Sequence, residues 1–99
     1  MSIIERYIEG ITHLCQEHRV DSMSVFGSVL TDKFNDDSDV DFLVSFMPVP
    51  VEEYADNYLQ LYAGLQTLLG RNIDLVEDKA VRNPIFRNNI ERTKVQIYG

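Results

Sequence analysis

One seven-residue segment limits the folds open to this chain more than any other feature. Residues 40–46, Val-Asp-Phe-Leu-Val-Ser-Phe, are rich in β-branched and aromatic side chains and predict a strand. The segment 47–50, Met-Pro-Val-Pro, ends it, because proline cannot continue a central strand ladder. The side chains expected to face a core on one side of this strand are Val40, Phe42, Val44 and Phe46. Asp39 and Asp41 then lie together on the opposite face.

Two amphipathic helices flank this strand in the sequence. Apolar side chains recur at helical spacing over residues 3–18, and Ser2 with Glu5 forms a capping-box pattern before them. The second helix covers residues 51–69, and Gly70 after it is a usual C-cap residue. Its tyrosines, four residues apart, suit either a row of binding groups or packing, and packing is favoured. These tyrosines are Tyr54, Tyr58 and Tyr62.

Shorter elements complete an alternation of helices and strands. Strands are expected at 23–26, 72–76 and 94–98, with a short helix at 29–34 and a C-terminal helix that Asn83-Pro84 opens. The pattern predicts an α/β (α+β) fold, a small mixed sheet flanked by helices. At 99 residues, the chain is expected to form one domain over residues 1–99.

The distribution of charge narrows the classes of partner. The net charge is −7, with a balance of −9 over residues 1–70 and +2 over residues 71–99. Direct nucleic-acid binding is not expected, because it depends on many Lys and Arg side chains that neutralise phosphates. A basic protein partner, or small anions bound with a metal, would suit this charge. With no membrane span, no secretion signal and one cysteine, Cys15, a cytoplasmic location is expected.

Asp39 and Asp41 are a candidate metal site. Two neighbouring carboxylates raise each other's pKa, and a cation between them relieves the repulsion. Carboxylate oxygens are the ligands that Mg²⁺ prefers, together with substrate phosphates. The alternative is a pair of solvated aspartates at a strand edge, which a D-x-D pattern alone does not exclude. An EF-hand loop is excluded, because Phe42 and Pro48 stand where glycine and glutamate would be required.

Gly27-Ser28 is a candidate phosphate-binding turn. It follows the 23–26 strand and precedes the 29–34 helix, where free amide groups can bind an anion. Glycine lets a phosphate approach the backbone, and the Ser28 hydroxyl adds a donor. Taken alone, the same dipeptide is typical of an ordinary strand-to-helix turn.

The joint spacing of these residues matches a known pattern. Gly27-Ser28, ten residues and Asp39-Val40-Asp41 resemble the G-S-x10-D-x-D signature of the nucleotidyltransferase superfamily that includes polymerase β. The C-terminal part is similar to that of minimal nucleotidyltransferase (MNT) proteins, in Ile73-Asp74-Leu75-Val76, Lys79, Asn83-Pro84 and Ile90. The resemblance covers residues 22–99 and implies a polymerase β-like nucleotidyltransferase fold. It also implies ATP as substrate and Mg²⁺, two ions, as cofactor.

Asp74 is the third predicted carboxylate. If the 72–76 strand pairs beside 40–46 with hydrophobic faces aligned, Asp74 joins Asp39 and Asp41 on one face. Three carboxylates on two strands are what two-metal phosphoryl transfer requires. The resemblance implies that Asp39 and Asp41 bridge the metals. It also implies that Asp74 holds one metal near the attacking hydroxyl, or serves there as general base.

One departure concerns nucleotide binding. The family usually has an Arg-Gly pair shortly after Gly-Ser, where this chain has Thr31-Asp32. Asp32 would repel a phosphate, and Lys33 would compensate if its side chain turned inward. The predicted nucleotide-binding residues are therefore Gly27, Ser28 and Lys33.

The resemblance leads to two main hypotheses of function. Minimal members of the family are similar to antitoxins that attach AMP to a tyrosine of a HEPN ribonuclease toxin, which implies a hetero-oligomer with such a partner. The first hypothesis is therefore a Mg²⁺- and ATP-dependent protein adenylyltransferase. The second is an inactive MNT-fold module that neutralises its partner by occlusion. Transfer of AMP to a small molecule or nucleic acid is a third, less favoured reading, because no further domain is visible to hold such an acceptor.

Overall fold

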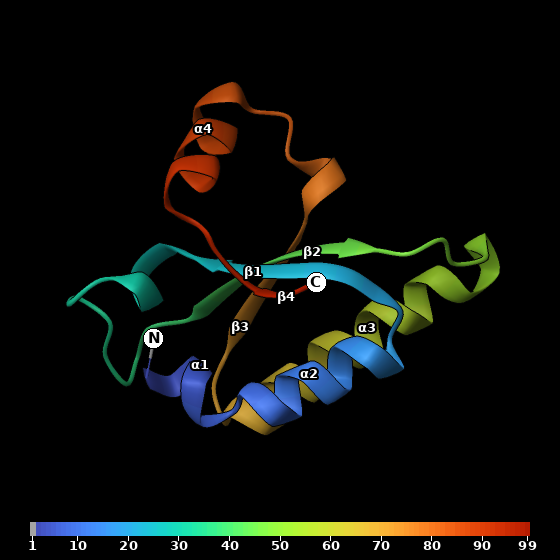
Figure 1. Cartoon of the computed structure of the whole chain (residues 1–99), viewed down its shortest axis with the longest axis horizontal. Helices are drawn as coiled ribbons and strands as arrows, with labels where there is room; N and C mark the ends of the chain where they lie inside the picture. The colour runs from blue at the N-terminus through green and yellow to red at the C-terminus, as the bar shows by residue number, and fades with distance from the viewer. Residues whose placement is uncertain (1) are drawn as a thin grey trace.

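A mixed four-stranded sheet forms the centre of the molecule (Figure 1). The computed structural model describes residues 2–99. The strands are β1 (Val20–Phe26), β2 (Val40–Phe46), β3 (Ile73–Glu77) and β4 (Val95–Tyr98), in the spatial order β3-β2-β1-β4. β1 is antiparallel to β2 and β4, whereas β2 and β3 are parallel. The sheet confirms the predicted fold class, and the 40–46 and 72–76 strands pair, which was the condition for placing Asp74 beside Asp41.

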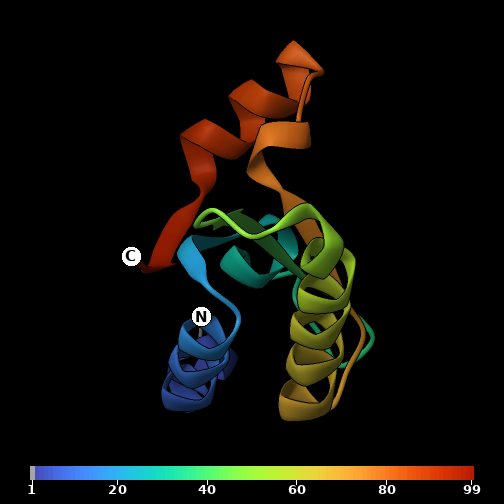
Figure 2. The same cartoon turned by 90° about the vertical axis from the view of Figure 1, so that its right-hand side faces the viewer.

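Helices cover the two faces of this sheet unequally. α1 (Ser2–Arg6), α2 (Ile8–Glu17) and α3 (Val51–Leu69) lie on one side, and α4 (Pro84–Thr93) lies on the other (Figures 1 and 2). The main core forms between the sheet and the first three helices, and it includes Cys15. Val40, Phe42 and Val44 are fully buried there, as predicted, while Phe46 is half-buried beside them.

α2 and α3 approach each other closely because each contributes a glycine to the contact. A Cβ atom at Gly10 would lie 2.8 Å from the Leu68 side chain, and one at Gly64 would lie 2.8 Å from Leu14. The two leucines therefore occupy the space that larger residues would fill. α3 ends as predicted at Gly70, whose left-handed backbone (φ 66°) lets its amide bond back to Gln66.

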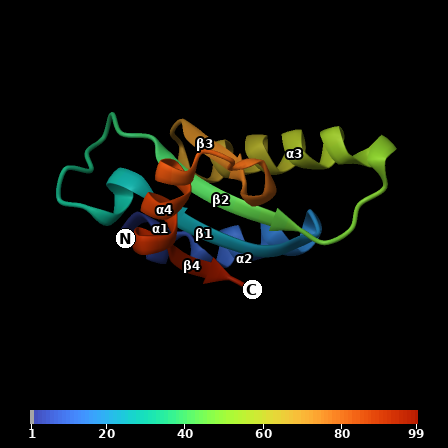
Figure 3. The ribbon, with the colours of Figure 1, turned by 90° about the horizontal axis from the view of Figure 1, so that it is seen from above.

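α4 rests on the opposite face of the sheet through a smaller cluster. Ile90 is buried against Phe26 and Leu43, which point away from the main core. The helix begins at Asn83-Pro84 as predicted, and the Asn83 side-chain oxygen accepts the amide hydrogens of Ile85 and Phe86. α4 therefore covers one part of this face and leaves the rest open (Figure 3).

Several predicted boundaries were wrong. The helix expected over residues 29–34 is a single 3-10 turn, η1 (Gly27–Leu30), because the Thr31 hydroxyl donates to the Ser28 carbonyl and turns the chain. The expected 3–18 helix is two helices that separate at Tyr7. β1 begins at Val20 rather than Met23, since pairing with β2 extends it through polar residues. A second 3-10 turn, η2 (Asp78–Ala80), follows β3.

The tyrosines of α3 pack against the edge of the sheet. The Tyr58 hydroxyl donates a short hydrogen bond to the Leu75 carbonyl on the outer strand β3. Packing, rather than a free row of binding groups, is therefore the role that the structure shows for Tyr58. None of the helices in residues 2–99 combines the length and hydrophobicity that a membrane crossing requires.

Candidate active site

Asp41 and Asp74 lie side by side on the face of the sheet that carries α4. They are register partners on the parallel strands β2 and β3, so their side chains project from the same face. On the other side of Asp41, its register partner on β1 is Phe26, which directly precedes Gly27. The backbone thus brings the carboxylates and the Gly27-Ser28 turn together, as the sequence predicted.

Gly27 is in direct contact with the Asp41 carboxylate. Its backbone is left-handed, with φ 78°, a conformation that residues other than glycine rarely adopt. A Cβ atom at this position would lie only 2.3 Å from Oδ2 of Asp41. The missing side chain therefore leaves the space that the Asp41 carboxylate occupies.

The three carboxylates affect each other electrostatically. Burial raises the pKa of Asp41, and the negative charges of Asp74 and then Asp39 raise it further. The charged form of Asp41 is therefore disfavoured in the protein alone. A bound cation would reverse this effect, because its charge stabilises the ionised carboxylates around it.

The donor chemistry of the site suits Mg²⁺, although the side chains do not form a closed metal shell. Within residues 2–99, no group of three or more His, Cys, Asp or Glu side chains converges closely enough to hold a metal ion. Asp39 and Asp74 are exposed, whereas Asp41 is half-buried. The carboxylates therefore fit a metal that substrate oxygens and water help to coordinate, as Mg²⁺ usually is.

The turn that follows Gly27 departs from the expected helix terminus. η1 is four residues long, so a helix macrodipole contributes little at Gly27 and Ser28. Ser28 is half-buried, and its carbonyl accepts bonds from the amide and the hydroxyl of Thr31. Anion binding here would depend on local amides and the Ser28 hydroxyl rather than on a helix.

Lys33 and Asp32 lie in an exposed part of the loop between η1 and β2. The backbone amide of Lys33 donates to the Thr31 hydroxyl. The ammonium group of the Lys33 side chain forms no ion pair with any of the described residues. The side chain is therefore not held in the site, and its predicted part in nucleotide binding stays a prediction.

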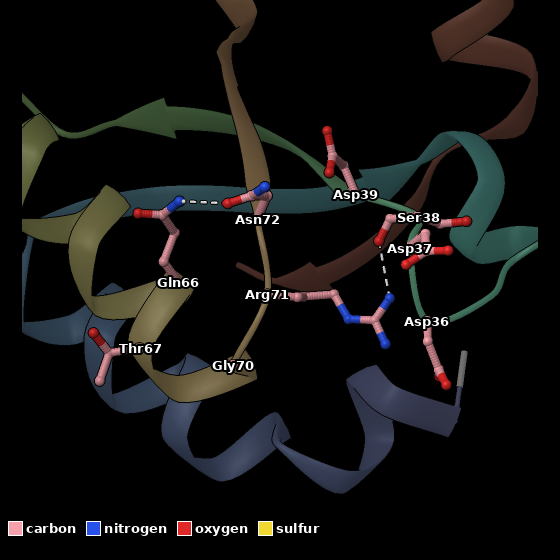
Figure 4. A pocket seen from close by; sticks show the side chains of 9 residues that line it. All are labelled: Asp36, Asp37, Ser38, Asp39, Gln66, Thr67, Gly70, Arg71 and Asn72. Carbon is pink, nitrogen blue, oxygen red and sulfur yellow. Dashed lines mark hydrogen bonds between the residues drawn. The ribbon is translucent and has the colours of Figure 1, made fainter.

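Two arginines that the sequence did not single out organise the surroundings of the site. Arg71 donates from Nη1 to the carbonyl oxygens of Asn35 and Ser38, each at 2.9 Å, in the loop before β2. The bond to Ser38 can be followed in Figure 4. Arg87 on α4 binds the Asp78 side chain and carbonyl, which ties α4 to η2. The only feature of the sequence that could have pointed to Arg71 is its position between the helix-ending Gly70 and the start of β3.

Comparison with known proteins assigns the class. The family model described as "Polymerase beta, Nucleotidyltransferase" matches residues 9–99. The chain therefore belongs to the polymerase β nucleotidyltransferase family and is a nucleotidyltransferase. Within this family it is a minimal nucleotidyltransferase. It is 28% identical to the solved "Structure of putative minimal nucleotidyltransferase", with a TM-score of 0.76 over 93% of this chain and 90% of the other.

Two relatives come from Methanocaldococcus jannaschii. "Putative protein adenylyltransferase MJ0128" is 32% identical over 84 residues, and "Putative protein adenylyltransferase MJ1379" is 29% identical over 84 residues. Each match covers 85% of this chain and 83% of the relative.

Two solved complexes share the fold at lower identity. One is a toxin-antitoxin crystal structure with AMP-PNP, at 18% identity and a TM-score of 0.73, covering 93% of this chain and 73% of the other. The other holds a tri-AMPylated Shewanella oneidensis HEPN toxin with its MNT antitoxin. Its TM-score is 0.67 at 16% identity, over 96% of this chain and 71% of the other.

Proposed function

We propose that this nucleotidyltransferase is a protein adenylyltransferase that acts as an antitoxin, transferring AMP from ATP to a tyrosine of a partner HEPN toxin. The observation that carries the proposal is the placement of Asp41 between Asp74 and Gly27, on the face of the sheet that carries α4. The names of the M. jannaschii relatives support a protein as acceptor. The two toxin-antitoxin complexes support the kind of partner.

Asp39, Asp41 and Asp74 are the proposed metal ligands. When bound, Mg²⁺ would neutralise the triphosphate and favour attack on the α-phosphorus. The half-buried Asp41 carboxylate lies against Gly27, whereas Asp39 and Asp74 are exposed and able to turn toward a ligand. Release of the mutual repulsion of these carboxylates would favour binding of the cation.

The remaining roles belong to the turn and to Asp74. The Gly27 and Ser28 backbone would bind triphosphate oxygens, with the Ser28 hydroxyl as a further donor and Lys33 as a neutralising charge. The tyrosine hydroxyl oxygen of the partner would form a bond to the α-phosphorus, while the bond from that phosphorus to the β-phosphate oxygen breaks. Pyrophosphate leaves with the bonding electrons, and Asp74 accepts the tyrosine proton. Positioning of the two reactants would supply much of the rate.

A second function rests on a specific departure from the family. Thr31-Asp32 stands where the family usually has the pair Arg-Gly, and the charge of Asp32 would repel the triphosphate. An MNT-fold module that neutralises its partner by occlusion would tolerate this residue. Retention of all three carboxylates favours the enzyme, because an unused acidic cluster costs stability through self-repulsion.

The experiment that tests transfer uses purified chain, its HEPN partner and ATP labelled at one phosphorus. Label on the α-phosphorus should appear on the partner only when Mg²⁺ is present, whereas label on the γ-phosphorus should not. The Asp39→Asn/Asp41→Asn double variant should leave the partner unlabelled. Transfer of the γ-label, or no transfer of either label by the wild type, would rule out the proposed reaction.

A further inference from the structure

Arg71 connects two segments that are far apart in the sequence. It lies between the end of α3 and the start of β3, and its guanidinium group reaches the loop that leads into β2. One nitrogen, Nη1, donates to the carbonyl oxygens of Asn35 and Ser38, both at 2.9 Å; Figure 4 shows the bond to Ser38. The guanidinium carbon also lies 4.6 Å from the centre of the Phe34 ring. A charge stacked on an aromatic ring and bonded twice holds one orientation.

These contacts hold the backbone on one side of Asp39. The Ser38 carbonyl belongs to the peptide group that precedes Asp39, and it accepts the bond from Arg71. On the other side, the Val40 amide donates to the carbonyl of Asn72 at 3.4 Å. Both peptide groups of Asp39 are therefore tied to the segment 71–72, directly before the strand that carries Asp74.

The internal bonds of the loop do not by themselves fix Asp39. Asn35 and Ser38 bond each other, and the Asn35 side chain accepts the amide of Asp37, so this network ends at Ser38. The Arg71 guanidinium forms no ion pair within residues 2–99. It binds carbonyls instead, which leaves the Asp39 carboxylate free for another cation.

We propose that Arg71 is a positioning residue, which holds the backbone of Asp39 at the start of β2, from where the Asp39 side chain can turn to bind a divalent metal together with Asp41 and Asp74. The proposal rests on the proposed function, because it assigns Arg71 a task only if Asp39 is a metal ligand. Arg71 does not touch the substrate in this account. It acts through the peptide group of Asp39, by fixing where β2 begins relative to β3.

The test compares Arg71→Ala and Arg71→Lys with Arg6→Ala, a control that removes the same charge from an exposed position of α1. Calorimetry with Mn²⁺ alone measures the metal site without any acceptor protein. Loss of a residue that orients a metal ligand typically weakens metal affinity roughly 10-fold to 100-fold, which is the effect we expect for R71A. R71K keeps the charge but lacks the planar fork, so its affinity should lie between the wild type and R71A. The Arg6→Ala control should bind like the wild type.

Two further measurements separate positioning from a general structural role. Amide hydrogen exchange should become faster in R71A over residues 35–40, while β1 and α2 keep their protection. In the transfer reaction, R71A should require more Mg²⁺ for half-maximal rate, with the KM for ATP at saturating Mg²⁺ unchanged. If R71A does not fold, R71K provides the same comparison.

The outcomes distinguish this inference from the proposed function. Wild-type affinity for Mn²⁺ in R71A would overturn the role of Arg71 while leaving the metal site intact. A raised KM for ATP with unchanged Mn²⁺ affinity would place Arg71 on the nucleotide and also overturn it. If the wild type binds no Mn²⁺, the metal site of the proposed function fails and this inference fails with it.

Discussion

Replacement of Gly27 by alanine tests the closest contact in the site. The added Cβ would lie 2.3 Å from Oδ2 of Asp41, whereas ordinary contacts begin near 3.4 Å. The carboxylate, or the turn, must therefore move by about 1 Å, a misplacement that can cost on the order of 100-fold in rate. The left-handed backbone adds a cost of about 1–2 kcal/mol for a residue with a side chain.

Gly70→Ala is a matched control for the backbone part of this effect. Gly70 has a similar φ of 66°, but a Cβ there would meet nothing within 4 Å. The backbone cost should lower the melting temperature of both variants, by about 4–8 °C for each kcal/mol in a domain of this size, and the clash with Asp41 should add to the loss in Gly27→Ala alone. Only Gly27→Ala should also lose transfer and Mn²⁺ affinity. If Gly27→Ala transferred AMP at the rate of the wild type, measured below its melting temperature, the assigned contact between the turn and the metal site would be refuted.

Three other predictions follow from individual interactions. Asp41→Asn should raise the melting temperature in EDTA near neutral pH, since the raised pKa of Asp41 in the folded state makes its ionised form destabilising. The gain should shrink as the pH falls toward the ordinary value of 3.8, where Asp41 is increasingly protonated in both states; a gain that instead grew toward low pH would contradict the sign. Asn83→Ala should lower the free energy of unfolding by about 1 kcal/mol, because two amides of α4 lose their acceptor; an unchanged urea midpoint would contradict this role. Calorimetry with ATP should show binding with Mg²⁺ and much weaker binding in EDTA. Equal affinity in both would show that ATP binding does not depend on the metal.

Much of the fold could be predicted because its signals are local. The alternation in 40–46 identified β2 and separated its core face from its acidic face. Gly70 and Asn83 marked helix ends through their own backbone and side-chain chemistry. Aligning the hydrophobic faces of two strands placed Asp74 on the same face as Asp41, and the structure adds that the two are register partners.

The errors and omissions concern interactions between distant residues. Arg71 contacts carbonyls 36 and 33 residues earlier, and no periodicity links such positions. The start of β1 depends on pairing with β2, and the polar residues Asp21 and Ser22 gave no strand signal of their own. The 29–34 segment has helix-compatible residues, but the hydroxyl of Thr31 bonds the chain into a turn instead.

The central claim is that Asp39 and Asp41 support AMP transfer to a HEPN partner. Intact mass spectrometry of that partner, co-expressed with each variant, tests it most directly. The wild type should leave the partner heavier by one or more adenylyl groups, and Asp39→Asn/Asp41→Asn should leave it unmodified. Asp36→Asn/Asp37→Asn removes the same charge from exposed positions of the neighbouring loop and should behave like the wild type. If the Asp39→Asn/Asp41→Asn variant still neutralised the partner while leaving it unmodified, neutralisation would not depend on AMP transfer. That result would contradict the account and establish occlusion instead.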